Sequence, residues 1–112
     1  MKIFKKQQIM WNVKAFDPGE VDVKMRQLII DLNNAGYETG GCCQGGKGHF
    51  DYAYVSFNRP FTKAFVKKID QANLITNPPS QSQVGIYSGE IRCDKDRELF
   101  KKQIKKLFGL ER

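Results

Sequence analysis

The chain has 112 residues, the usual size of one domain and enough to bury a core without a metal or a disulfide. No apolar run is long enough to cross a bilayer, the basic first residues lack the apolar core of a signal peptide, and three cysteines make a poor disulfide framework. These features favour a cytoplasmic protein with reduced thiols and no membrane partner. The formal net charge of +7 favours an anionic partner such as nucleic acid.

The first predicted element is a strand over residues 9–16, where apolar and polar residues alternate loosely. A helix follows, because Asp17 and Glu20 form a capping box around Pro18. Apolar residues then recur at helical spacing, and Gly36 ends the helix as a left-handed cap. The members of this apolar stripe are Val21, Met25, Leu28, Ile29 and Leu32.

Two short strands are predicted next, over residues 37–42 and 52–57, and their separation suits an antiparallel hairpin. A second helix is expected to begin at Pro60, because apolar residues then recur at four-residue spacing. These residues are Phe61, Phe65, Ile69 and Ala72.

Residues 77–83 contain two prolines and read as an exposed loop. A further strand is predicted over residues 84–93, with a serine–glycine pair at positions 88–89 that could break it. Asp94 is expected to cap a final helix with one apolar side. That side contains Leu99, Phe100, Ile104, Leu107 and Phe108.

The predicted order is therefore strand, helix, strand, strand, helix, strand, helix, in a single domain of residues 1–112 with no internal repeat. The first six elements match the ferredoxin-like βαββαβ arrangement, an α+β fold with an antiparallel sheet backed by two helices. The last helix is an addition, which would lie across the open sheet face or extend from its edge.

The strand at residues 52–57 places Tyr52 and Tyr54 on one side and aliphatic residues on the other. Because a sheet buries its aliphatic side against helices, the tyrosines should lie on the open face, where they could stack unpaired bases. Trp11 on the first strand could add a third ring. The alternative is ordinary alternation, with both tyrosines covered by the last helix. The stretch Tyr-Ala-Tyr-Val-Ser-Phe resembles the second half of the RNP1 signature of RNA-recognition-motif domains.

A glycine-rich loop between the two hairpin strands is the second candidate site. Five of the ten glycines lie between Gly40 and His49. Consecutive backbone N–H groups in such a loop can hold a phosphate or a nucleotide-like anion, although a flexible hairpin tip is the alternative. The predicted ligand-binding residues are Thr39, Cys43, Gln44, Gly45, Gly46, Lys47 and His49.

The same loop raises the possibility of zinc or thiol chemistry. Cys42, Cys43 and His49, with Asp51 or Cys93 brought in by the fold, could supply zinc ligands. Adjacent cysteines on an extended backbone point to opposite sides, however, so neither a metal site nor a cofactor is predicted. A cysteine nucleophile activated by His49 would need an orienting acid and an oxyanion site, and no enzyme is predicted.

A family resemblance covers residues 21–57. The motif Gly-Tyr-x-Thr…Cys-Cys-x-Gly…His at residues 36–49 resembles a group of small phage and prophage proteins. The same region is distantly similar to the wybutosine-synthesis methyltransferase family, which acts on tRNA. The resemblance implies that Thr39, Cys43 and Gly45 belong to a binding region. It also implies an alternative function, a phage-type regulator or inhibitor that docks on a host nucleic-acid-handling protein.

The last helix carries lysines in i, i+4 pairs of like charge, which a bound polyanion would stabilise. They are Lys101, Lys102, Lys105 and Lys106. The sequence thus predicts a small basic protein that binds RNA or single-stranded DNA. Bases would stack on Tyr52, Tyr54 and Trp11, while Lys47 and the helix lysines would contact phosphates. The alternative is capture of a nucleotide-like small molecule by the loop from Gly40 to His49.

Overall fold

The computed structural model describes residues 3, 21–77 and 83–110. These residues form an α+β fold with a four-stranded antiparallel sheet in the order β1-β2-β4-β3. The helices are α1 (Arg26–Asn34), α2 (Lys63–Gln71) and α3 (Asp94–Leu107), and the strands are β1 (Thr39–Cys43), β2 (Tyr52–Phe57), β3 (Ile75–Thr76) and β4 (Val84–Glu90). None of the helices in these ranges has the length and apolar sequence required to cross a membrane.

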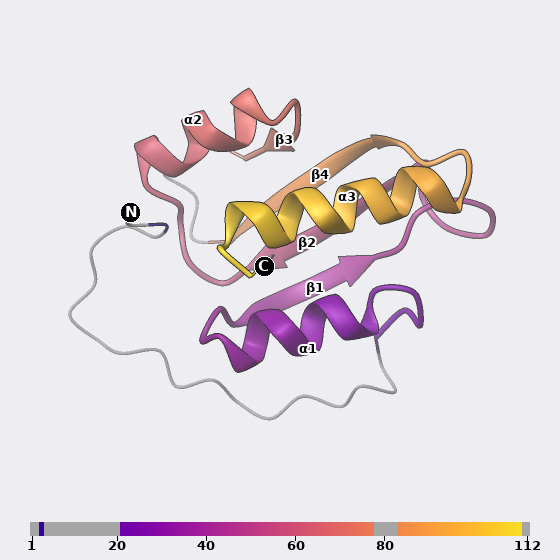
Figure 1. The fold of residues 1–112 in the computed structure, drawn as a ribbon, viewed down its shortest axis with the longest axis horizontal. Coiled ribbons are helices and arrows are strands. Elements are labelled where there is room, and N and C mark those ends of the chain that lie inside the picture. Colours follow the sequence, from indigo (N-terminus) through magenta and orange to yellow (C-terminus); the bar gives the residue numbers. More distant parts are fainter. Residues whose placement is uncertain (1–2, 4–20, 78–82, 111–112) are drawn as a thin grey trace.

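The three helices lie together on one side of the sheet (Figure 1). Side chains alternate between the two faces along β2, so Ala53, Val55 and Phe57 point toward the helices and are fully buried. Val84 and Ile86 of β4 are buried beside them. The core therefore occupies the space between this face of the sheet and the helices.

The predicted apolar stripe of the first helix is confirmed from Met25 to Leu32, whose members are at most 2% exposed. The predicted cap at Asp17 lies outside the described residues. Helix α1 begins at Arg26, after a turn in which the Met25 N–H donates to the Asp22 carbonyl oxygen. The Asp22 carboxylate accepts a hydrogen bond from the Gln44 N–H at 3.0 Å, so Asp22 joins the start of α1 to the end of β1.

The expected βαββαβ order is not matched. Strand β2 pairs with β1 along one edge and with β4 along the other. In the ferredoxin-like arrangement the first strand would lie between β2 and β4, whereas here these two strands pair directly. The predicted strand at residues 9–16 lies outside the described residues. Within the described ranges the order is helix, two strands, helix, two strands, helix.

The last helix packs on the same side as the other two, which corrects the prediction that it lies across the open face or extends from the sheet edge. Phe108, at its end, stacks on Phe57 with ring centroids 5.0 Å apart and meets Phe65 edge-on at 5.2 Å. Phe100 and Ile104 are buried in the same core, whereas Leu99 is 58% exposed and does not belong to the predicted apolar side. The helix therefore completes the core.

The second pair of strands also differs from the prediction. Residues 88–89 do not break β4, because the Ser88 hydroxyl accepts the Ala53 N–H at 2.8 Å, where the register between β2 and β4 shifts. Strand β3 follows α2 directly and pairs with β4. A two-residue strand is too short to show an alternating pattern, and the sequence therefore did not predict it.

Within the described residues the order of a helix followed by two strands occurs twice, although the sequence shows no evident repeat. The bounds of α2 are those of α1 displaced by 37 residues, from 26 to 63 and from 34 to 71. Both helices end in the same motif: Gly36 and Asn73 have positive φ, and the residue after each donates its N–H to Leu32 or Ile69. The central β2–β4 pair joins the two units.

Candidate functional site

Four aromatic side chains gather on the face of the sheet that faces away from the helices. Tyr52 and Tyr54 project from β2, and the register pairs Tyr54 with Tyr87 of β4. Phe50 lies two residues before Tyr52 and stacks on its ring with centroids 5.4 Å apart and planes within 5°. The predicted position of both tyrosines on the helix-free face is confirmed within the described residues, because α3 packs on the other side.

The four rings form a continuous cluster. Tyr87 lies 5.7 Å from both Tyr52 and Tyr54, measured between ring centroids, and the two β2 tyrosines are 6.2 Å apart. Phe50 is 56% exposed and Tyr52 is 37% exposed, while the other two are half-buried. Burial raises the pKa of Tyr54, so its hydroxyl stays protonated and adds no negative charge at neutral pH.

Beside the rings lies a depression of about 420 Å³. Its floor includes Ser56 and Gly85, two small residues paired across β2 and β4. The Tyr87 ring lies so close to Gly85 that a Cβ there would be 2.9 Å from its hydroxyl oxygen. Gly85 therefore allows the ring to lie along the sheet. The amide side chains of Asn77 and Gln83 also line the depression and supply polar groups next to the rings.

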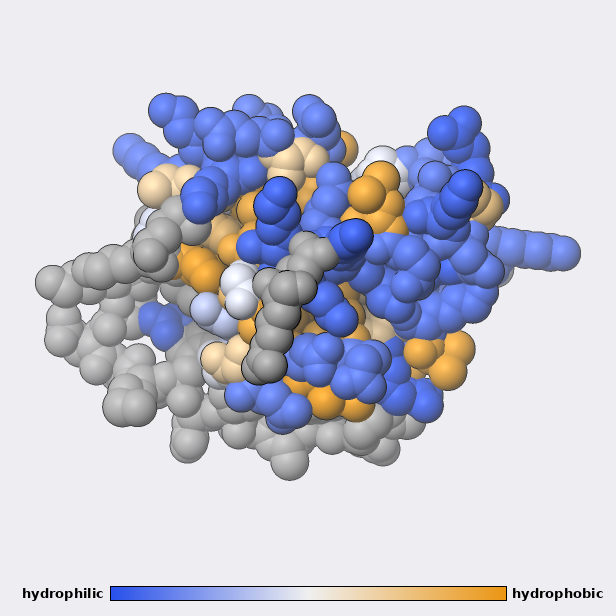
Figure 2. All heavy atoms as spheres, viewed as in Figure 1, coloured by the Kyte–Doolittle hydropathy of each residue, from blue (hydrophilic) through white to orange (hydrophobic). Residues whose placement is uncertain are grey.

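The predicted phosphate-binding lysines of α3 lie on the opposite layer from the aromatic cluster (Figure 1). Lys101 forms an ion pair with Glu98 at 3.1 Å, and Lys105 forms one with Asp31 of α1 at 3.5 Å. Lys102 and Lys106 are both exposed. Figure 2 shows the mainly hydrophilic surface over this side of the molecule. One flat nucleic-acid strand cannot contact both layers, so the structure does not bring the two predicted halves of the interface together.

Two further residues were predicted to stack a base or to contact phosphate, Trp11 and Lys47. Trp11 lies outside the described residues. Lys47 is exposed in the loop between β1 and β2, three residues before Phe50. It is therefore the predicted cation closest in sequence to the aromatic cluster.

The glycine loop between β1 and β2 is folded by hydrogen bonds of its own. The Gly46 N–H donates to the Phe50 carbonyl oxygen at 2.9 Å, and the His49 N–H donates to the Gly46 carbonyl oxygen at 2.9 Å. Gly45 has φ of +71°, and a Cβ there would lie 2.8 Å from the Tyr52 carbonyl carbon. Close packing therefore requires glycine at this position, and several predicted anion-binding N–H groups are used within the loop.

Arg97 of α3 fixes the start of this loop and was not predicted as a functional residue. Its side chain is only 6% exposed. The guanidinium donates to the Gln44 carbonyl oxygen at 2.8 Å and to the Gly45 carbonyl oxygen at 3.0 Å, and it forms an ion pair with Asp94. The loop thus presents carbonyl oxygens to a buried cation. Thr39, by contrast, lies at the other end of β1 and exchanges hydrogen bonds with Asn33.

A second group of side chains meets beside the loop. Asp22, Cys43 and His49 place one ligand atom each within 4.8 Å of one another. The Cys43 Sγ atom is 3.8 Å from His49 Nδ1, and an Asp22 carboxylate oxygen is 3.5 Å from the same nitrogen. Sequence reasoning identified Cys43 and His49 but missed Asp22, which lies before α1 and carries no local motif.

This group does not have the geometry of a catalytic relay. In such a relay the nucleophile and the carboxylate contact different imidazole nitrogens, so that one orients the ring while the other loses its proton. Here both contact His49 Nδ1. Cys42 packs against the core on the other face of β1, as expected for adjacent cysteines. Burial and the Asp22 carboxylate raise the pKa of Cys42 to about 11, so it stays a thiol at neutral pH.

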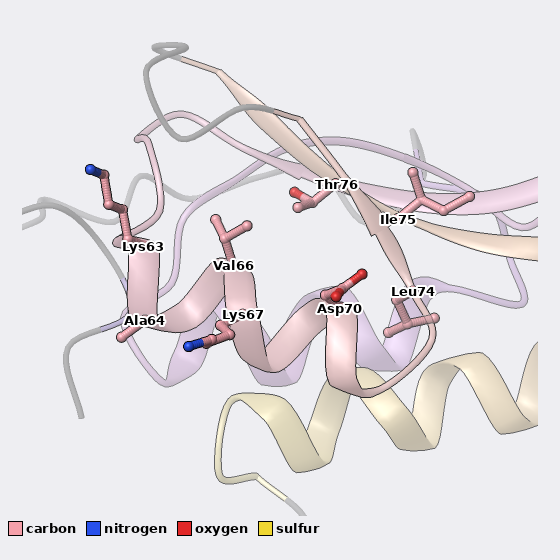
Figure 3. Close-up of a pocket in the computed structure, with 8 residues that line it drawn as sticks. All are labelled: Lys63, Ala64, Val66, Lys67, Asp70, Leu74, Ile75 and Thr76. Carbon is pink, nitrogen blue, oxygen red and sulfur yellow. The ribbon is translucent and has the colours of Figure 1, made fainter.

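A further depression of about 710 Å³ lies between α2 and β3 (Figure 3). Val66, Leu74 and Ile75 supply apolar surface there. The charged groups of Lys63 and Lys67 are spread along the helix and do not converge on one point (Figure 3). This arrangement lacks the convergent polar groups of a ligand site.

Comparisons of the chain with protein-family models, with curated proteins and with solved structures give no match. The candidate sites therefore stand on their own geometry. They are the aromatic cluster on the sheet and the Asp22, Cys43 and His49 group beside the glycine loop.

Proposed function

We propose that this protein binds single-stranded RNA or DNA by stacking unpaired bases on the face formed by Phe50, Tyr52, Tyr54 and Tyr87. The observation that carries the proposal is a continuous cluster of four rings, with Phe50 and Tyr52 exposed, on a sheet face that no described helix covers. Aromatic side chains on an open sheet are the usual platform for unpaired bases, because every base has a flat π-face.

The surroundings of the rings support the same proposal. The depression beside them is floored by small residues, and the side-chain amides of Asn77 and Gln83 can donate to and accept from base edges. The raised pKa of Tyr54 keeps its hydroxyl uncharged at neutral pH, so it does not repel phosphate. Lys47 is the proposed phosphate contact near this face, and the lysines of α3 are excluded from it by their position on the helical layer.

The proposal is tested by fluorescence anisotropy with a short labelled single-stranded RNA and the corresponding DNA. Tyr54→Ala and Tyr87→Ala should each weaken binding about 5- to 150-fold, because stacking of one base is worth about 1–3 kcal/mol. Lys102→Glu on the opposite layer is the control and should change affinity less than about threefold. Equal losses from the tyrosine and lysine variants would reject the aromatic face as the binding surface.

A mononucleotide competitor separates this proposal from capture of a nucleotide-like small molecule. The depression of about 420 Å³ has room for one nucleotide. If the polynucleotide spans several rings, excess mononucleotide should displace it poorly. Complete displacement at stoichiometric mononucleotide would instead assign the face to a small ligand.

A further inference from the structure

Three segments that are distant in sequence bring Asp22, Cys43 and His49 together. Asp22 precedes α1, Cys43 ends β1, and His49 lies in the glycine loop. Their side chains offer a carboxylate, a thiol and an imidazole, which are the three ligand types that zinc binds in proteins. Cys43 is 6% exposed, while the side chains of the other two are each 30% exposed, so the group is accessible from one side.

Two of the three separations are close to those between ligand atoms around one tetrahedral ion, and the third is within 4.8 Å. Zinc–sulfur bonds of about 2.3 Å and zinc–nitrogen or zinc–oxygen bonds of about 2.0–2.2 Å place neighbouring ligand atoms about 3.4–3.6 Å apart. The Cys43 Sγ to His49 Nδ1 distance is 3.8 Å, and the Asp22 Oδ2 to His49 Nδ1 distance is 3.5 Å. Cys43 and Asp22 both approach His49 Nδ1. This arrangement argues against a catalytic relay, but it is the arrangement that binding to a common ion requires.

The groups that hold these ligands are hydrogen-bonded in turn. The Gln44 N–H donates to Asp22 Oδ2 at 3.0 Å, and the carbonyl of the same residue accepts from the buried Arg97. The turn in which the His49 N–H donates to Gly46 fixes the backbone that carries the imidazole. Outer contacts of this kind orient the ligands of metal sites and raise metal affinity.

We propose that Asp22, Cys43 and His49 bind one Zn²⁺ ion, with water in the fourth position. A carboxylate and a thiolate would balance the two charges of the ion, and the Cys43 thiol would release its proton when the metal binds. Three protein ligands with an accessible fourth position form an open zinc site, in contrast to the closed four-ligand sites that serve only structure.

The experiment uses the full chain, stripped with a chelator and then titrated with Co²⁺ and with Zn²⁺. Co²⁺ should bind with a stoichiometry of one. It should give the visible bands of a tetrahedral site together with a thiolate-to-cobalt charge-transfer band in the near ultraviolet. Calorimetry should give the same stoichiometry for Zn²⁺. The absence of both bands in the unmodified protein would overturn the proposal.

Matched variants assign the ligands. Cys43→Ser should abolish the charge-transfer band, and His49→Gln and Asp22→Asn should each lower zinc affinity more than about 100-fold, since even outer-shell changes cost about 10- to 100-fold. Cys42→Ser and Cys93→Ser are the controls and should leave the spectrum unchanged. His49 is exposed, so its variant keeps the assignment testable if Cys43→Ser does not fold. Zinc affinity that survives all three ligand substitutions, or is lost in Cys42→Ser, would overturn the assignment.

Discussion

Arg97 is a buried cation whose hydrogen-bonding groups are matched by carbonyl oxygens of the glycine loop. It contacts the carbonyls of Gln44 and Gly45 and the carboxylate of Asp94. A guanidinium removed from water is tolerated only when such partners replace its hydration. The loop and the arginine therefore depend on each other: the carbonyls stabilise the charge, and the charge holds the loop on α3.

Replacing Arg97 with leucine should lower the free energy of unfolding by about 2–4 kcal/mol, because two loop carbonyls lose their donor. Urea denaturation followed by circular dichroism measures the change. Arg92→Leu is the matched control, because the Arg92 side chain is 77% exposed and its loss should change stability by at most about 0.5 kcal/mol. Similar effects of the two substitutions would contradict the role assigned to Arg97.

Two glycines of the same loop form a matched pair for a second prediction. Gly45 and Gly48 both have positive φ, but a Cβ would collide with the β2 backbone only at Gly45. Gly48→Ala should cost about 1–2 kcal/mol for the backbone conformation alone. Gly45→Ala should cost about 1–3 kcal/mol more, since the surrounding atoms must move. Thermal unfolding of both variants measures the difference, and equal midpoints would refute the close packing at Gly45.

For single residues, the sequence predicted the orientation of side chains only where a local pattern such as strand alternation determines it. Alternation along residues 52–57 placed Tyr52 and Tyr54 on the same side of the strand, but it left open whether the last helix covers them. Asp22 and Arg97 were missed because their contacts with Gln44 cross 22 and 53 positions of the chain. No periodicity or spacing rule reports a contact over such a separation.

Helix α3 was predicted as an amphipathic helix, but its side of the sheet was not, and its N-cap is Cys93 where Asp94 was expected. Its apolar stripe was found, except that Leu99 points to solvent. An apolar stripe indicates that one side of a helix is buried, but the helix can bury that side against either face of a sheet. The choice follows from the Phe57, Phe65 and Phe108 cluster, which brings three elements together and has no signature in any one of them.

If α3 completes the core, truncating the Phe108 side chain should lower the stability of the protein more than most single substitutions. The ring is 4% exposed, and Phe108→Ala should destabilise the protein by about 3–5 kcal/mol through lost burial and the cavity that remains. Leu99→Ala on the same helix is the control, with an expected change of about 0.5 kcal/mol or less. Denaturant unfolding compares the two variants. A small effect at Phe108 would mean that α3 is a peripheral addition, as first predicted.

The whole molecule presents two different surfaces, one aromatic and one rich in lysine. The sequence predicted both but joined them into one interface, because position along the chain does not reveal on which layer an element lies. The fold class was predicted correctly as α+β with an antiparallel sheet. The strand order was not, since β3 is only two residues long and the sequence does not reveal that β2 pairs directly with β4.

The separation of the two surfaces predicts different behaviour toward paired and unpaired nucleic acid. Duplex DNA offers no free base faces, so it should bind only through charge, with an affinity that falls steeply as salt rises. The double substitution Lys102→Glu and Lys106→Glu should weaken duplex binding, and Tyr54→Ala should leave it unchanged. Gel-shift titrations at two salt concentrations make the comparison. Loss of duplex binding in Tyr54→Ala would contradict the division of the surfaces.

The contact between Arg97 and the glycine loop also determines when during folding the loop can take its final shape. The loop carbonyls are bonded by a side chain more than fifty positions further along the chain. The β1–β2 hairpin can form early from neighbouring segments, but the loop at its tip must wait until α3 has docked, because long-range contacts form late when much chain must be ordered first. We therefore expect Asp22, Cys43 and His49 to reach their final arrangement only after α3 has docked, so that a partly folded chain would display the hairpin without a finished site.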